Sequence, residues 1–362
     1  MRTGTANLPL HGGKCPQWLF GKMKKLSGAI SEAIVDEYGQ NELLTRISSP
    51  YWFQSFGCLL GFDWHSSGLT TTVCHALKES VNKANLGITF AGGKGRYSRN
   101  TLSEIKNSSA KNIDSLAYAS KITAKVDTSL LQDAYQLYHH SFAFTDKGQW
   151  AVIQQGMNES YARRYHWLSS GVKKFVEEPH NAICCNNYSE TLDLSARQSR
   201  ETRNVSLDLV KDNPARIFSH FGKQKTLSAF TGNKEENLTM TPRHWINNCD
   251  LTKNDKEILR KAYEFQPKNY EELLHFKGMG PKKIRALAMV SNIVYGTESS
   301  WRDPAKYSFS HGGKDGTPFP VDRQTYDNSI HELRESLKNA KLGERDKLSA
   351  LKRLNNYIMA KG

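Results

Sequence analysis

The most chemically suggestive stretch of the sequence runs from Leu273 to Leu287 and contains two glycines one residue apart, Gly278 and Gly280. A segment with the hydrophobic period of a helix precedes them. A second such segment begins at Pro281, and proline favours the first position of a helix. Glycines let a backbone approach a ligand closely, and the free amides at a helix N-terminus attract an anion. The pattern therefore predicts two short helices joined by a tight hairpin that binds phosphate.

Three cationic residues begin the second predicted helix, namely Lys282, Lys283 and Arg285. Cations beside a helix N-terminus add charge to the surface that faces a phosphate. We therefore expect the hairpin glycines and these three side chains to contact the backbone of DNA. A plain helical hairpin closed by a Gly-x-Gly turn is the alternative interpretation.

This segment resembles the helix-hairpin-helix family, in which Gly-apolar-Gly is followed by a basic residue and then a small one, here Ala286. It is also similar to the base-excision glycosylases of that superfamily, where a lysine inside the second helix is the nucleophile and an aspartate follows in a Pro-Val-Asp context. Lys282 and Asp322 match those two positions. The resemblance implies attack of the lysine amine on the sugar C1′, with the carboxylate stabilising the developing positive charge. It also allows a structural monovalent cation at the hairpin, and the chemistry requires no other cofactor.

A second candidate surface is the basic glycine loop from Gly92 to Arg99. Its backbone is flexible, its cations attract phosphate, and an aromatic ring offers a stacking surface for an unpaired base. We expect Lys94, Arg96 and Tyr97 to contact DNA there. An exposed basic turn without a ligand is the alternative.

Acidic and histidine side chains in the first half of the chain leave a nuclease interpretation open. Such residues bind Mg²⁺ or Mn²⁺, which activate water for phosphodiester hydrolysis. A structural role is favoured for them, and no residue is assigned as a metal ligand. The candidates are Asp63, His65, Lys94, Asp127, Asp133, His139, His140, Gln154, Glu177, Glu178 and His180.

These functional residues need a scaffold, and the hydrophobic periodicity predicts an α+β fold. We expect helices over 19–38, 69–82, 125–140 and 161–176, a buried strand or short helix over 51–63, and strands over 87–91 and 150–155. Further helices are expected over 253–265, 270–276, 281–295, 327–339 and 344–359. A polar stretch places a domain boundary near residue 225. The prediction is a mixed α/β domain over 1–225, and a helical domain over 226–362 that carries the hairpin.

The composition favours a nucleic-acid partner. The chain has 50 Lys and Arg against 36 Asp and Glu, which gives a formal charge of +14, and a polyanion is the simplest partner for such a surface. No window resembles a membrane span or a secretory signal, and the six cysteines form no Cys-x-x-Cys pair. We expect a cytoplasmic protein that binds duplex DNA, intact or damaged, with its oligomeric state open.

Three functional hypotheses follow. The first is a DNA-repair protein that acts as a lesion-base glycosylase and AP lyase through Lys282 and Asp322. The second is a metal-dependent nuclease with its active site in the first domain, and the third is a non-catalytic nucleic-acid-binding protein. Nearly end to end, the chain also resembles a prokaryotic family catalogued as domain of unknown function 763. That resemblance rests on 2–6, 11–14, 61–68, 154–158 and 307–323, and it implies no activity.

Overall fold

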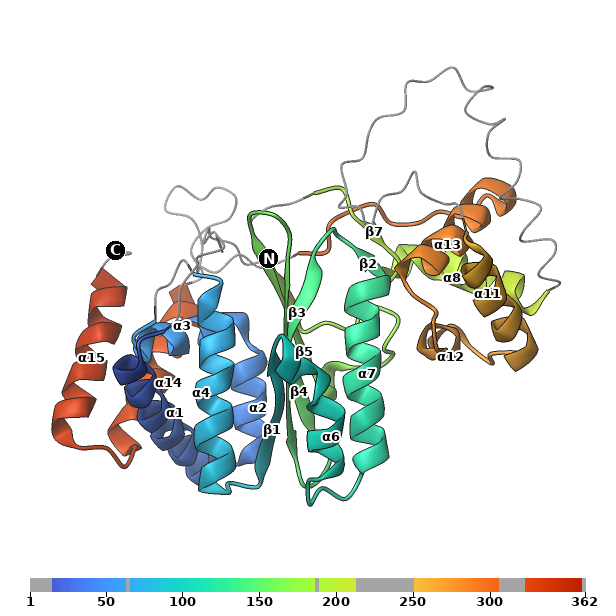
Figure 1. Ribbon diagram of the computed structural model, residues 1–362. Helices are drawn as coiled ribbons and strands as arrows, with labels where there is room; N and C mark the ends of the chain where they lie inside the picture. The colour runs from blue at the N-terminus through green and yellow to red at the C-terminus, as the bar shows by residue number, and fades with distance from the viewer. Residues whose placement is uncertain (1–14, 63–65, 186–188, 213–250, 306–322, 360–362) are drawn as a thin grey trace.

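A five-stranded antiparallel sheet with strand order β1-β3-β4-β5-β6 forms the centre of the molecule. The computed structural model describes residues 15–62, 66–185, 189–212, 251–305 and 323–359. The strands are β1 (Ile88–Lys94), β3 (Gln136–Thr145), β4 (Trp150–Met157), β5 (Ala162–Leu168) and β6 (Ala182–Cys184). Figure 1 shows the sheet between groups of helices, so the predicted α+β class is confirmed.

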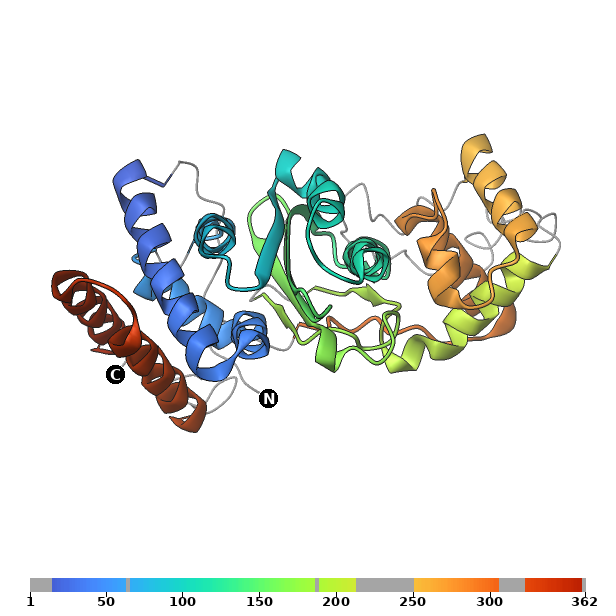
Figure 2. The same ribbon diagram turned by 90° about the horizontal axis from the view of Figure 1, so that it is seen from below.

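Both faces of the sheet are covered, because successive side chains of a strand point to opposite faces. Ala143 and Ile153 belong to one hydrophobic cluster, and Phe142 and Val152 belong to the other. The first face packs against α1 (Gln17–Tyr38), α2 (Gln40–Ser48), α3 (Pro50–Leu59) and α4 (Gly68–Ala84). The second packs against α6 (Thr101–Lys106) and α7 (Ile113–Ser129), and Figure 2 shows this layering from below.

A helical group adjoins α7 and contains the predicted hairpin. It consists of α8 (Arg200–Lys211), α11 (Lys253–Phe265), α12 (Tyr270–His275) and α13 (Pro281–Tyr295). Leu259, Leu273 and Leu287 are buried within it and belong to the same cluster as the α7 face of the sheet. A two-stranded sheet of β2 (Leu131–Gln132) and β7 (Leu192–Asp193) lies between α7 and this group.

The last two helices, α14 (Arg323–Asn339) and α15 (Glu344–Met359), pack against α1 and α3 (Figure 1). Leu333 and Leu354 are buried in the same cluster as Met23. Packing therefore crosses the boundary expected near residue 225 in both directions. The earlier α8 contacts α13, whereas the later α14 and α15 contact the N-terminal helices.

Two predicted helices are wrong. The segment 125–140 is helical only to Ser129, and 161–176 contains strand β5. In β5 the buried polar residues Arg163, Arg164 and His166 are fully enclosed. The adjacent arginines Arg163 and Arg164 interrupt the apolar alternation that reveals a strand.

Other elements match their predicted bounds closely, notably α11, α13 and α15. Segment 51–63 contains helix α3, which is one of the two options expected for it. Across the described ranges, none of the helices has the length and apolar character needed to cross a bilayer.

Candidate functional site

The hairpin between α12 and α13 adopts a tight turn that depends on Gly278. The side chain of Asn269 caps α12 by accepting a hydrogen bond from the Glu272 amide at 2.9 Å. Gly278 has a φ of +88°, and a Cβ added there would lie 2.9 Å from the Cδ1 atom of Ile258 in α11. The left-handed backbone favours glycine at this position, and a side chain there would also force the end of the Ile258 side chain to shift.

Gly280 has a different environment, which is open. Its backbone is extended (φ −121°, ψ −178°), a conformation that any residue adopts. A Cβ added to Gly280 would meet nothing nearer than the carbonyl oxygen of Gly278, at 4.0 Å. The missing side chain therefore leaves space beside the backbone without being required by the fold.

In the hairpin, the backbone amides of Gly278, Gly280 and Lys282, like that of Lys277 just before them, have no acceptor among the described residues. The intervening amide of Met279 donates to Phe276, and that of Lys283 donates to Gly280, each at 3.1 Å. Gly278 is exposed, and Gly280 and Lys282 are partly exposed. Unpaired amides at alternate positions form the kind of surface that binds an anion.

The N-terminus of α13 reinforces this surface. The helix is 15 residues long, begins at Pro281 and has no side-chain cap at Gly280. Its first turn thus presents the free amide of Lys282 and the positive end of the helix dipole. The Lys282 side chain is 30% exposed, and its Nζ atom lies 3.7 Å from Oδ2 of Asp255. The arrangement can hold a phosphate oxygen through backbone donors, with one lysine beside it.

Lys283 and Arg285, which we expected to contact phosphate, both have buried side chains. Lys283 Nζ lies 2.6 Å from Asp255 Oδ1. The Arg285 guanidinium donates to the Gln132 side chain at 3.0 Å, and Gln132 donates to the carbonyl oxygen of Pro281 at 3.1 Å. These two cations hold α13 against its neighbours instead of facing a ligand.

Asp255 and Lys125 carry contacts that our sequence analysis missed. Asp255 forms a capping box with Thr252 at the start of α11, and a Thr-x-x-Asp pattern could have revealed it. Burial would raise the pKa of Asp255, but hydrogen bonds from Lys283 and Thr252 outweigh it and lower that pKa to about 2. Lys125 of α7 donates to three hairpin carbonyl oxygens. Because these residues are 149 to 154 positions away, no local pattern indicates the contact.

Only one residue of the predicted catalytic pair lies in the part of the chain that the structure describes. Lys282 lies at the start of α13 as expected, whereas Asp322 falls outside the described residues. Within the described ranges, the carboxylate paired with Lys282 is Asp255.

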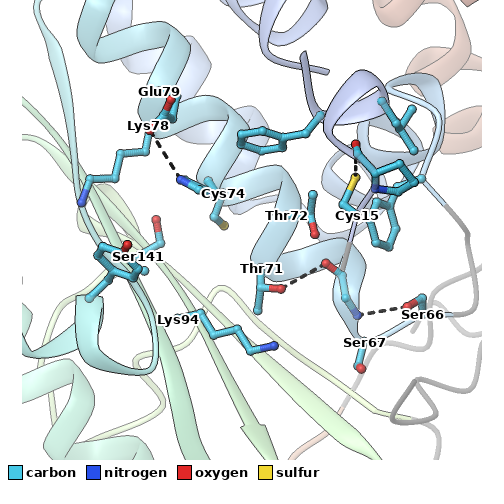
Figure 3. A pocket seen from close by; sticks show the side chains of 18 of the residues that line it. Cys15, Ser66, Ser67, Thr71, Thr72, Cys74, Lys78, Glu79, Lys94 and Ser141 are labelled. Carbon is cyan, nitrogen blue, oxygen red and sulfur yellow. Dashed lines mark hydrogen bonds and ion pairs between the residues drawn. The ribbon is translucent and has the colours of Figure 1, made fainter. Parts of the chain in front are cut away.

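The basic glycine loop lies elsewhere, at the end of β1. Gly92 has a φ of +85°, and a Cβ there would lie 2.2 Å from the carbonyl oxygen of His140. Lys94 and Tyr97 line a cavity of about 1080 Å³. Figure 3 shows Lys94 directed into the space in front of Ser67 and Thr71 at the start of α4.

Arg96 is exposed beside the Tyr97 ring, with its guanidinium carbon 5.3 Å from the ring centroid. No hairpin residue lines this cavity. The two predicted DNA-contacting surfaces are therefore separate, and the structure does not bring Lys94, Arg96 or Tyr97 to the hairpin.

Two of the carboxylates considered for a metal-dependent nuclease, Asp127 and Asp133, lie in buried polar networks. The Asp127 carboxylate accepts hydrogen bonds from Gln154, Trp167 and His180. Asp133 accepts hydrogen bonds from Arg163 at 3.0 Å and Tyr165 at 2.6 Å.

The two adjacent histidines on β3 are also enclosed. Burial lowers the pKa of His139 to about 3 and that of His140 to about 4. Asp63 and His65 lie outside the described residues. Over the part of the chain that the structure describes, no three His, Cys, Asp or Glu side chains are grouped so that they could hold a metal ion.

Comparison with known proteins gives one match. A family model described as "Protein of unknown function (DUF763)" matches residues 4–321. No curated protein and no solved structure matches the chain.

Proposed function

The chain belongs to the DUF763 family, whose description assigns no activity, and we propose from the hairpin geometry that it binds the sugar-phosphate backbone of DNA. The observation that carries this proposal is the set of three unpartnered amides at Gly278, Gly280 and Lys282. Backbone donors recognise phosphate without reading bases, so the binding is independent of DNA sequence.

The open space at Gly280 supports the same conclusion. A side chain at this position would stand between the free amides and a phosphate, yet the fold itself has room for one. The absence of a side chain is therefore explained by a close approach of the ligand to the backbone. The formal charge of +14 adds a long-range attraction to a polyanion.

A repair setting is part of this proposal. Lys282 is the one cation of the predicted trio that is accessible at the hairpin, with its side chain 30% exposed. Base excision with strand nicking would require a carboxylate beside Lys282 that stabilises the positive charge developing on the reacting sugar. Asp255 is already engaged by Lys283 and Thr252, so that role stays assigned to Asp322.

The test is a fluorescence titration of labelled duplex DNA at two salt concentrations, with wild type and Gly280→Val. Wild type is expected to bind sequences of different composition alike and to weaken as salt rises. Gly280→Val is expected to lose at least about tenfold in affinity, since each lost charge-assisted hydrogen bond contributes about 1.5–3 kcal/mol.

The matched control is Gly171→Val, because a Cβ at Gly171 also meets nothing within 4 Å and this residue lies outside the hairpin. It should bind like wild type. Circular dichroism must show that both variants are folded. A folded Gly280→Val protein with wild-type affinity would remove the hairpin as the binding surface, and salt-insensitive binding would contradict a backbone contact.

A further inference from the structure

The ammonium group of Lys125 lies within a cage of carbonyl oxygens on the inner side of the hairpin. Its Nζ atom is 2.7 Å from the carbonyl oxygen of Leu274, 2.9 Å from that of Phe276 and 2.8 Å from that of Met279. An ammonium has three donors, and each of them has one acceptor here.

The three carbonyl oxygens suit a cation. Leu274 lies in the last turn of α12, and among the described residues neither its carbonyl oxygen nor that of Met279 accepts a hydrogen bond from a backbone amide. Orphaned carbonyls near a helix C-terminus carry partial negative charge. No described carboxylate pairs with Lys125, and burial together with the nearby Lys283 ammonium lowers the pKa of Lys125 to about 8. The three carbonyl oxygens are therefore the groups that hold this partly buried charge.

The position of Lys125 also determines where one of the free amides points. The carbonyl of Met279 and the amide of Gly280 belong to the same peptide unit. In a planar trans peptide the C=O and N–H bonds point in opposite directions. Because Lys125 holds the Met279 oxygen inward, the Gly280 N–H must point outward, toward the open space described above.

We propose that Lys125 is the built-in cation of the hairpin, which takes the place that a bound monovalent metal ion would fill and holds the amides of Gly278, Gly280 and Lys282 ready for phosphate. Lys125 is a positioning residue and does not touch the ligand. The claim that the amides are oriented for phosphate rests on the proposed DNA binding. The claim that Lys125 stands in for a metal ion does not, so an experiment can contradict either claim without the other.

The experiment measures hydrogen exchange by mass spectrometry in peptides that cover residues 270–284 of the full chain. Lys125→Ala is expected to speed exchange of the Met279 amide at least about tenfold, because the loss of charge-assisted hydrogen bonds worth more than 1.4 kcal/mol has that effect. Lys121→Ala is the matched control, since it removes the same charge one turn earlier on α7 from an exposed side chain. It should leave this exchange unchanged.

Rescue by added cations distinguishes a cage from general packing. In Lys125→Ala, propylammonium or potassium should restore slow exchange, whereas tetramethylammonium at equal ionic strength should not, because it is too large and has no N–H donor. Wild type should show the same exchange in all three salts, because its site is already filled. A wild-type hairpin that requires potassium, or a variant that all three salts rescue alike, would overturn the proposal.

Lys125→Met provides a second variant if Lys125→Ala does not fold, since it keeps an apolar stem and removes the ammonium group with its charge and its donors. Wild-type exchange in Lys125→Met would also overturn the proposal. DNA affinity is then measured on the same samples. Slow wild-type exchange without any DNA binding would contradict the proposed function alone and leave the role of Lys125 intact.

Discussion

The ammonium of Lys283 and the carboxylate of Asp255 form a buried ion pair 2.6 Å long that joins α13 to α11. Both residues are less than one-tenth exposed. The neighbouring Lys282 lies 3.7 Å from the same carboxylate with a more exposed side chain. Two adjacent lysines of similar sequence context thus have different roles, one inside the fold and one at its surface.

The first prediction concerns the buried member of that pair. Lys283→Met should lower the free energy of unfolding by about 2–3 kcal/mol, because it leaves the Asp255 carboxylate buried without its main partner. The loss is at the low end for a broken buried pair, since Thr252 still donates to Asp255. Denaturant titration measures it. A stability change within 0.5 kcal/mol, the usual range for a surface substitution, would show that the pair contributes little.

Acid should destabilise the protein through the same carboxylate. The folded-state pKa of Asp255 is about 2, below its ordinary value of 3.8. A lowered pKa means that its ionised form contributes stability above pH 4, and that this contribution is lost as pH falls from 4 toward 2. Thermal melts of wild type and Asp255→Asn at a series of pH values test this. The variant should be less stable at pH 7, and the difference should shrink at low pH. A constant difference would contradict this assignment.

Substitution of the two hairpin glycines should affect different properties, stability at Gly278 and DNA affinity at Gly280. Gly278→Ala should cost about 1–2 kcal/mol of stability, because alanine disfavours a φ of +88° and its Cβ would force the Ile258 side chain to shift. Gly280→Ala should be close to neutral for stability and should reduce DNA affinity instead. Unfolding curves and binding curves of both variants give the comparison. Equal destabilisation by the two substitutions would be inconsistent with the open environment of Gly280.

The hairpin was largely predictable from the sequence because its signals are local. Pro281 at the first helical position, the Gly-x-Gly turn and the apolar period of α13 all agree, and the observed helix has the expected bounds. The identity of its exposed cations was not predictable. Lys283 and Arg285 are buried by partners on α11 and β2, and such partners are set by tertiary packing.

The sheet was harder to predict for a related reason. Strand β5 buries Arg163 and Arg164 completely. These neighbours point to opposite faces of the sheet, so a polar residue is buried on each face and the usual alternation is interrupted. Arg163 is held by Asp133 and Asp303, which are distant in sequence. Sequence patterns assume that charges face solvent, and this assumption fails wherever a buried charge finds its partner through the fold.

The last prediction separates the surface lysine from its buried neighbour. Lys282→Gln should leave stability within about 1 kcal/mol of wild type, because a partly exposed ion pair contributes little. It should weaken DNA binding for all sequences alike and reduce the slope of log affinity against log salt by about one, as expected for one lost phosphate contact. Unlike Lys283→Met, it should act on binding and not on folding.

The same variant tests the base-excision chemistry. If the Lys282 amine attacks the sugar, wild type incubated with abasic duplex and borohydride should form a covalent complex in the presence of EDTA. Lys282→Gln should abolish that complex while retaining most of the DNA binding, and Lys277→Gln, which removes an exposed cation from the same hairpin, should retain both. A wild-type protein that binds abasic DNA without trapping would limit the role of Lys282 to phosphate contact. Turnover that EDTA abolishes would instead indicate a metal-dependent nuclease.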